Sequence, residues 1–271
     1  MRESSLLSKE YQGDVRRDSL QLSPDNMFNN ALAVMDNLVS RATTRWTLEE
    51  SKLFICALSK VKTRDEQGWI RLPKKDLYEL FGIKNPSSTY LKKLAKSVVT
   101  KSWFEFVRSE DDWDQGFLVN RSKGDRWNIY LKFADDYLPL LDQLSEKFTQ
   151  IYVESIAGMT HKSSYNLYLY LKSWGDPNFL QSEKKIPKAE IQKIFNLKDG
   201  QYWRNWGTDK ARFHWADFEK YCLKPAIEEI NAGVPGTSEI YIDHWEKVKK
   251  GKAVLGYDFF FTLVDKHGLP Q

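Results

Sequence analysis

Basic side chains gather at two places in this sequence, and the chemistry they could perform there is the binding of phosphate groups. The stretch from Gly82 to Trp103 holds five lysines and no acidic residue. The two groups are Lys84, Lys92, Lys93, Lys96 and Lys101, and then Lys247, Lys249, Lys250 and Lys252. The whole chain has a net charge of only +4, from 41 basic and 37 acidic residues. Local clustering, rather than bulk charge, therefore indicates contact with nucleic acid.

Residue patterns that would support catalysis are missing from the sequence. There is no Gly-x-x-x-x-Gly-Lys-Ser/Thr loop to hold a nucleotide phosphate, and no His-hydrophobe-His pair to hold the metal of a nickase. Paired carboxylates occur at Asp111/Asp112 and at Glu228/Glu229 without a histidine partner, and we interpret them as solvated charge. We therefore expect a protein that is not an enzyme and that carries no cofactor and no metal.

Two stretches of the chain have nearly the same sequence. Residues 72–84 read LPKKDLYELFGIK and residues 186–198 read IPKAEIQKIFNLK, a separation of 186 − 72 = 114 positions. Where the letters differ, most changes exchange like for like. A repeat at this spacing predicts two copies of one small domain in tandem, and 271 residues leave room for two cores.

Composition indicates a globular protein outside the membrane. Hydrophobic residues make up 41% of the chain and aromatic residues 14%, which is too much apolar surface for a mainly disordered chain. No window holds 18 uncharged apolar residues, and the first 20 residues do not read as a signal peptide. We expect a cytoplasmic location and no membrane partner. Cys56 and Cys222 fall in apolar helical patterns and are expected in the core.

The first copy reads as three helices followed by strands. Residues 1–26 lack any period and are expected to form a flexible tail, and a helix is expected to begin near Asn29. The helix of residues 47–61 opens with a capping box, Thr47 and Glu50. After it we expect the strand WIRLP, the helices KKDLYELFG and YLKKLAKSVVTK, and the strands WFEFV, GFLVN and RWNIYLKF.

The second copy follows the same plan with a longer, Trp-rich connection. Its expected helices are SYNLYLYLKSW, IPKAEIQKIF and ADFEKYCLKPAIEEIN, and Pro225 is expected to kink the last of these. A long hairpin around a Lys-Lys-Gly-Lys turn forms the wing. We predict an α+β fold of two tandem winged helix-turn-helix domains related by an internal pseudo-repeat. The tail of residues 1–26 precedes the domains of residues 27–146 and 147–267.

The third helix of a winged helix enters the major groove, and the hairpin tip reaches nearby phosphates or the minor groove. Leu91, Leu94 and Val98 share the core face of the first such helix, so its lysines face outward. In the second helix Lys220 and Lys224, spaced i, i+4, lie opposite Phe218. The predicted DNA-binding residues are Ser88, Thr89, Lys92, Lys93, Lys96, Ser97, Thr100, Arg121, Lys123 and Arg126 in the first copy, and Lys188, Arg212, Lys220, Tyr221, Lys224, Lys247, Lys249, Lys250 and Lys252 in the second.

Two features are expected to contribute less to DNA binding. The turn RSEDDWDQ is acidic and would repel DNA, so the tip RSKGDR is favoured in the first copy. The aromatic residues of the long connection could stack on bases, but packing beneath the connection is the expected role of Trp203, Trp206, Phe213 and Trp215.

Several of these segments resemble the plasmid replication initiators that bind iterons. The segment ADFEKYCLKPAIEEIN is similar to the third helix of that family's second winged-helix domain. RWTLEESKLFICALSKV resembles its opening helix, and FTQIYVESI and SYNLYLYLKSW resemble the start of its second domain. The resemblance extends over about residues 28–265. It implies two winged-helix domains that grip adjacent major-groove segments of one directly repeated origin site.

The resemblance also implies partners and regulation. Monomers would start theta-type plasmid replication, while homodimers, formed through the first domain and in equilibrium with monomers, would repress the initiator's own promoter at an operator inverted repeat. The expected partners are double-stranded DNA, a second copy of the chain, the host replication initiator and the replicative helicase. The second domain would be the main sequence-specific DNA-binding unit.

The resemblance leaves one residue and two functions open. The family's groove-facing basic positions fall on Glu219, Lys220 and Tyr221, and Glu219 and Tyr221 stand where arginines often occur. Glu219 could accept a hydrogen bond from cytosine or face away from the groove. Two alternatives to an initiator are a winged-helix repressor with no replication role and a DNA-processing enzyme.

Overall fold

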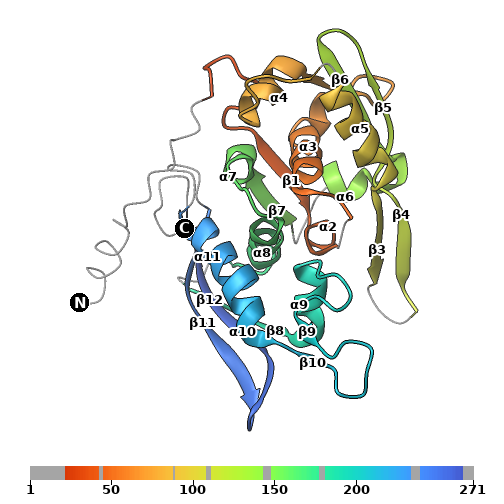
Figure 1. The fold of residues 1–271 in the computed structure, drawn as a ribbon. Coiled ribbons are helices and arrows are strands. Elements are labelled where there is room, and N and C mark those ends of the chain that lie inside the picture. Colours follow the sequence, from red (N-terminus) through yellow and green to blue (C-terminus); the bar gives the residue numbers. More distant parts are fainter. Residues whose placement is uncertain are drawn as a thin grey trace, which may run out of the picture.

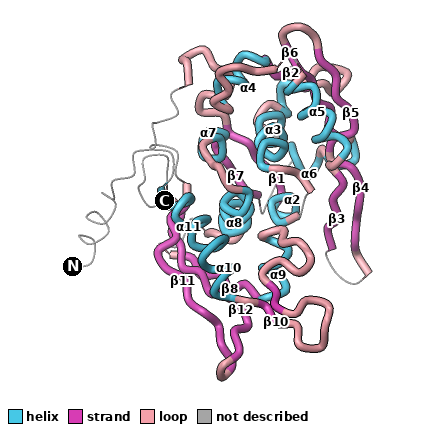
Figure 2. The backbone as a smooth tube through the Cα atoms, viewed as in Figure 1, coloured by secondary structure: helices cyan, strands magenta, loops and turns pink. Residues whose placement is uncertain are grey.

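The computed structural model describes residues 22–42, 45–87, 89–107, 111–142, 148–176, 181–232 and 239–264. These residues form two units built from helices and small sheets; in Figure 1 the first runs from red to yellow-green, and the second from the green of β7, α7 and α8 through teal to blue. Figure 2 shows that a hairpin projects from each end of the molecule: β5–β6 at one end and β11–β12 at the other. The mixed α+β content agrees with the predicted fold.

The first unit contains a complete winged helix-turn-helix. Its helices are α2 (Asn37–Arg41), α3 (Leu48–Leu58), η1 (Val61–Thr63), α4 (Lys74–Leu80), α5 (Tyr90–Thr100), η2 (Asp135–Tyr137) and α6 (Pro139–Asp142). Its strands are β1 (Leu32–Asp36), β2 (Ile70–Pro73), β3 (Trp103–Val107), β4 (Trp113–Phe117), β5 (Val119–Gly124) and β6 (Asn128–Phe133). The predicted capping box of α3 is present, because Thr47 and Glu50 exchange hydrogen bonds between side chain and backbone.

The second unit repeats this order. Its elements are β7 (Phe148–Tyr152), α7 (Val153–Ala157), α8 (Lys162–Lys172), β8 (Ser182–Pro187), α9 (Lys188–Ile194), β9 (Trp203–Arg204), β10 (Arg212–Phe213), α10 (Trp215–Phe218), the π-helical turn η3 (Glu219–Leu223), α11 (Lys224–Ala232), β11 (Ile240–Lys250) and β12 (Ala253–Leu263). Strand order β8–β12–β11 matches β2–β6–β5, with every neighbouring pair antiparallel. The prolines that end β2 and β8 are 187 − 73 = 114 positions apart, so the predicted duplication is confirmed.

The two units join through equivalent elements. Strand β1 pairs antiparallel with β7, from Leu32 opposite Tyr152 to Asp36 opposite Phe148. Helix α2 of the first unit contacts α8 of the second, and the equivalent helix α7 of the second unit contacts α3 of the first. Lys52 of α3 donates to the carbonyls of Ala157 and Met159, both at 2.7 Å. The seam is therefore nearly symmetric, with the same strand and short helix used by both copies.

The helix predicted near Asn29 is wrong, because strand β1 and the short helix α2 occupy this segment. Ala33 and Met35 are buried while their neighbours are half-exposed, and this alternation suits a strand with one covered face. Of the expected flexible tail, residues 1–21 lie outside the described residues. Residues 22–26 are placed, and Asn26 is buried and donates to the carbonyl of Asp76. Residues 22–26, which were expected to belong to the tail, therefore pack against the first unit.

The strands that follow α5 in the first unit differ from the three that the sequence predicts. The predicted strand GFLVN is split at Leu118, whose backbone N–H donates to the carbonyl of Ser102. Part of the expected turn RSEDDWDQ belongs to β4, and β3 and β4 form a separate two-stranded sheet. Strand β5 continues to Gly124, so the turn of the β5–β6 hairpin is only residues 125–127.

Both cysteines are core residues, as predicted. Cys56 is fully buried and Cys222 nearly so, and each is a free thiol. Burial raises the pKa of both thiols, that of Cys222 to about 12, so neither is a thiolate near neutral pH. In the part of the chain that the structure describes, every helix is too short or too polar to cross a membrane.

Candidate nucleic-acid interface

Helix α5 presents its lysines to solvent, as its sequence pattern predicts. Leu91, Leu94, Ala95 and Val98 are buried, whereas the exposed positions are Thr89, Lys92, Lys93, Lys96 and Thr100. Ser97 differs from the expectation, because its hydroxyl donates to Glu50 of α3. This contact engages Ser97 with the protein interior, and we drop it from the proposed DNA contacts. Ser88 lies outside the described residues.

A basic groove runs between α5 and the β5–β6 hairpin. It has a volume of about 450 Å³, and Lys74, Lys92, Lys96 and Lys123 line it together with Ser122 and Asp125. Helix α5 packs against β5, which fixes the distance between the helix and the hairpin. Four lysines around one groove create a strong positive potential, and this suits a phosphate backbone.

The tip of this first wing is held by one carboxylate. Asp125 accepts hydrogen bonds from the Tyr130 hydroxyl at 2.8 Å and from the backbone N–H groups of Asn128 and Trp127, both at 2.7 Å. These bonds lower the pKa of Asp125 to about 2. The Arg126 guanidinium lies 4.7 Å from the ring centre of Trp127, which is 68% exposed. Sequence reasoning identified Arg126 but missed Trp127, because a single Trp after a polar turn has no periodic signal.

Two further predicted residues of the first wing lie over an aromatic ring. The charged groups of Arg121 and Lys123 lie 5.2 Å and 4.1 Å from the ring centre of the buried Trp69. Both side chains remain exposed on β5. Cation–π contacts of this kind restrict the side chains while leaving the charge available to an anion.

The recognition helix of the second unit is continuous from Trp215 to Ala232 and contains a π-helical turn. Phe218, Cys222 and Ile230 are buried on one face, and Lys220, Tyr221 and Lys224 are exposed on the other, as predicted. The π turn, Glu219–Leu223, comes directly before Lys224 and Pro225. Proline has no N–H to donate and its ring crowds the preceding turn, so a widened turn accommodates it within the helix.

Glu219 faces the wing and not the groove. Its Oε1 accepts from the Tyr257 hydroxyl at 2.6 Å and pairs with Lys247 Nζ at 2.8 Å. Burial and the Glu219 hydrogen bond together raise the pKa of Tyr257, so the phenol remains a donor. Glu219 therefore braces the recognition helix against β11 and β12, and this favours the alternative in which it faces away from the groove. Lys247 is engaged in this brace, so the second wing has fewer free cations than predicted.

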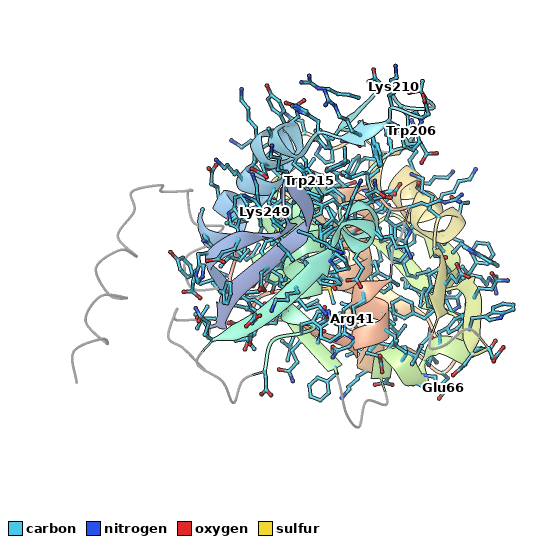
Figure 3. The ribbon with its side chains drawn as sticks, turned by 90° about the horizontal axis from the view of Figure 1, so that it is seen from below. Arg41, Glu66, Trp206, Lys210, Trp215 and Lys249 are labelled. Atoms are coloured by element: carbon cyan, nitrogen blue, oxygen red, sulfur yellow. The ribbon has the colours of Figure 1, made fainter. Side chains whose placement is uncertain are left out.

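The remaining predicted cations of the second unit are exposed, except for Lys188. Lys249, Lys250 and Lys252 are exposed at the tip of the β11–β12 hairpin, where Gly251 adopts a left-handed φ of 59°. Figure 3 labels Lys249 on this hairpin. Arg212 is exposed on β10. In contrast, Lys188 is half-buried, with its Nζ 4.3 Å from the ring centre of Trp203, and burial lowers its pKa.

The carboxylate pair Glu228/Glu229 is not uniformly solvated. Glu228 is exposed, but Glu229 is only 4% exposed. Its Oε1 accepts from Thr160 N at 2.8 Å and from the Thr160 hydroxyl at 2.6 Å, and its Oε2 accepts from His161 N at 3.1 Å. Glu229 therefore binds α11 to the chain just ahead of α8. The expectation of solvated charge is wrong for this residue.

Metal-binding geometry is not found in the described residues, where no three His, Cys, Asp or Glu side chains are arranged to hold an ion. The duplicated units each place an outward lysine face on the third helix and a hairpin beside it. This arrangement defines a tandem winged-helix protein of the DNA-binding class.

The family assignment agrees with this class. Residues 32–172 match the family model described as "Initiator Replication protein, WH1", and residues 187–261 match "Initiator Rep protein, WH2". The chain belongs to this family of initiator replication proteins, whose members carry two winged-helix domains. The first match ends at residue 172, and the domain boundary predicted at residues 146 and 147 stays a prediction.

One solved structure shows the same fold. The chain is similar to the Pi initiator protein, solved in complex with iteron DNA, with a TM-score of 0.66 and 17% sequence identity over 86% of this chain and 98% of that one. Domains 2 and 3 of RctB match with a TM-score of 0.46 and 13% identity, covering 90% of this chain and 95% of that one. No curated protein matches the sequence of this chain.

Proposed function

We propose that this chain is a plasmid replication initiator that binds directly repeated origin DNA, or iterons, as a monomer and so starts theta-type replication. The observation that carries the proposal is the duplicated lysine face. Lys92, Lys93 and Lys96 are exposed on α5, and Lys220 and Lys224 are exposed on the equivalent helix of the second unit. Two recognition helices in one chain suit two successive major-groove segments of one repeat. The Pi initiator, which has the same fold, was solved with iteron DNA.

The DNA that flanks the gene tests this proposal. We expect it to contain tandem repeats about two helical turns long. In electrophoretic shifts the full chain should prefer a duplex with one such repeat over the same bases in scrambled order. Equal affinity for both duplexes would refute sequence-specific initiation. If a plasmid with the gene deleted still replicated from that origin, the repressor alternative would be favoured instead.

Dimerisation through the first domain is part of the proposal. The β3–β4 sheet exposes Trp103, Trp113 and Phe117, and the rings of Trp103 and Phe117 lie 5.1 Å apart, edge to face. Among the described residues these two strands pair with no third strand, so each has an edge that a second copy of the chain could extend. We propose that the dimer binds an operator inverted repeat and represses the initiator's promoter. Trp113→Lys should shift sedimentation toward the monomer, and an unchanged profile would exclude this surface.

The proposal assigns the chain no catalytic activity and a cytoplasmic location. The host replication initiator and the replicative helicase are its proposed protein partners. Purified protein should neither turn over ATP nor cleave DNA strands. Either activity would support the DNA-processing alternative.

A further inference from the structure

The connection between the second and third helices differs strongly in length between the two units. From α4 to α5 it spans residues 81–89, and from α9 to α10 it spans residues 195–214. The extra length forms a small hairpin, in which β9 pairs with β10 and Phe213 lies opposite Trp203. We call residues 195–214 the β9–β10 connection.

The backbone of this connection adopts an unusual number of left-handed conformations. Asn196, Tyr202 and Asn205 have φ values of 48°, 60° and 52°, a region that asparagine tolerates but that a bulky residue such as tyrosine rarely adopts. Gly200 and Gly207 are also left-handed, at 75° and 81°. Strained backbone of this kind persists only where the surrounding structure imposes it, and it concentrates at functional sites.

Packing and hydrogen bonds hold the strained backbone in place. The ring of Trp203 lies edge-on to Trp206 at 5.1 Å and to Phe213 at 5.8 Å. A Cβ atom on Gly200 would approach the Trp206 ring to 3.1 Å, so the glycine allows the ring to lie against the backbone. At the hairpin tip, the Thr208 hydroxyl donates to the carbonyl of Asn205 at 2.7 Å. The connection is thus a preorganised platform.

This platform displays a large apolar ring and three cations. Trp206 is 51% exposed, although the other rings of the cluster pack as predicted. Arg204, Lys210 and Arg212 are exposed, and among the described residues none of them has an ion-pair partner. Asp209 is the one acidic residue between positions 203 and 213. An exposed Trp beside unpaired cations is typical of a binding surface for a polyanion.

The connection stands next to the end of the helix that enters the groove. Helix α10 begins at Trp215, two residues after β10 ends. The N-terminal end of a recognition helix is the end that approaches the base edges. Figure 3 shows Trp206 and Lys210 at the same edge of the molecule as the blue helix, with Glu66 at the opposite edge. Residues that project beyond this end of the helix are therefore placed to meet the backbone of a duplex that the helix binds.

We infer that the β9–β10 connection is a third DNA-contacting element of the second domain. Lys210 and Arg212 neutralise phosphates beside the recognition helix, and Trp206 packs on the sugar-phosphate backbone between them. This inference rests on the proposed function, and it enlarges the footprint of the second domain relative to the first. Trp206 packs against Trp203 on one side, as expected, and the inference concerns the side of the ring that remains exposed.

Full-length variants and two duplexes test the inference. One duplex carries a single copy of the direct repeat that flanks the gene, and the other has a mixed sequence of equal length. The variants are Trp206→Ala, Trp206→Phe and the double variant Lys210→Ala with Arg212→Ala. Lys62→Ala serves as the matched control, because Lys62 is an exposed lysine on η1, outside the proposed interface. Affinity is measured across about 50 to 200 mM salt.

The double variant should flatten the plot of log affinity against log salt concentration by about two on both duplexes. Trp206→Ala should weaken repeat binding about tenfold without changing that slope, while Trp206→Phe retains most of the affinity. Hydroxyl-radical footprints of Trp206→Ala and of the double variant should lose protection at one end of the repeat. Lys62→Ala should match wild type in every assay.

Unchanged affinity, slope and footprint in both the Trp206→Ala and the double variant would overturn the inference. If Lys220→Ala with Lys224→Ala still weakened repeat binding in that case, the proposed function would stand without it. If wild type showed no preference for the repeat while the double variant lost slope, the proposed function would fail and the DNA contact would stand. If the variants lost affinity only for single-stranded oligonucleotides and not for either duplex, the proposed duplex contact would be overturned. The double variant changes only exposed side chains, so it remains informative should Trp206→Ala fail to fold.

Discussion

Glu229→Gln should destabilise the fold by an amount that depends on pH. Burial disfavours the charged form of Glu229, but the hydrogen bonds that it accepts from the backbone and hydroxyl of Thr160 and from the backbone of His161 outweigh that cost, and the pKa falls from 4.5 to about 2. The difference, 4.5 − 2 = 2.5, corresponds to about 3 kcal/mol of unfolding free energy. Glutamine keeps the shape of the side chain but has one acceptor oxygen and no charge. We therefore expect a loss of about 2 to 3 kcal/mol at pH 7.

The pH dependence of this loss follows from the sign of the shift. A carboxylate whose pKa is lower in the folded state stabilises that state fully above pH 4.5, and this contribution is lost as the pH falls toward 2. Urea unfolding of wild type and variant, measured from pH 7 downward, should show a difference that is constant near neutrality. That difference should shrink below pH 4.5.

The neighbouring Glu228 provides a matched control. Glu228 is exposed on the same helix, so Glu228→Gln should change the unfolding free energy by no more than about 0.5 kcal/mol. Equal effects of the two substitutions would refute the reasoning, because it rests on the burial and hydrogen bonds of Glu229 alone. A pH-independent loss for Glu229→Gln would refute the assigned pKa shift.

Three further predictions follow from the interface and the seam. The double variant Lys220→Ala with Lys224→Ala should weaken binding to the repeat duplex and lower the salt slope by about two. Its unfolding free energy should stay within about 0.5 kcal/mol of wild type, and substantial unfolding would show that these side chains are not at the surface. Glu219→Gln should release Lys247 from its ion pair, so binding to mixed-sequence DNA should strengthen and its salt slope should increase by about one. The preference for the repeat should fall, and an unchanged preference would argue against the bracing role of Glu219. Burial lowers the pKa of Lys162 from 10.5 to about 7, so the unfolding free energy of wild type relative to Lys162→Met should rise between pH 7 and 10.5. A difference in unfolding free energy that stays constant across that range would contradict the burial of the ammonium.

The duplicated helices could be predicted because their signals are local. The match between residues 72–84 and 186–198 places Pro73 and Pro187 at equivalent positions, and both are the residues directly before a helix. The capping box at Thr47 and the period of the apolar residues in α5 depend on neighbours three or four positions away. Such patterns are determined by the helix itself, so they survive in a single sequence.

The seam between the units could not be predicted in the same way. Strand β1 exists because β7 pairs with it from more than 100 residues away, and five residues around Val34 carry no strong strand signal alone. Glu219 and Glu229 are ordinary exposed positions in a helical pattern until Tyr257 and Thr160 are brought against them. The roles of these acids are set by tertiary contacts, which spacing along the chain does not reveal.

A hydroxyl-radical footprint of the full chain on a duplex with one repeat tests the central claim most directly. Two recognition helices on one duplex predict two protected segments. Substitution of Lys92, Lys93 and Lys96 by alanine should remove one segment, and substitution of Lys220 and Lys224 should remove the other. A single protected segment, or loss of the same segment in both variants, would contradict a chain that grips DNA with two copies of one domain.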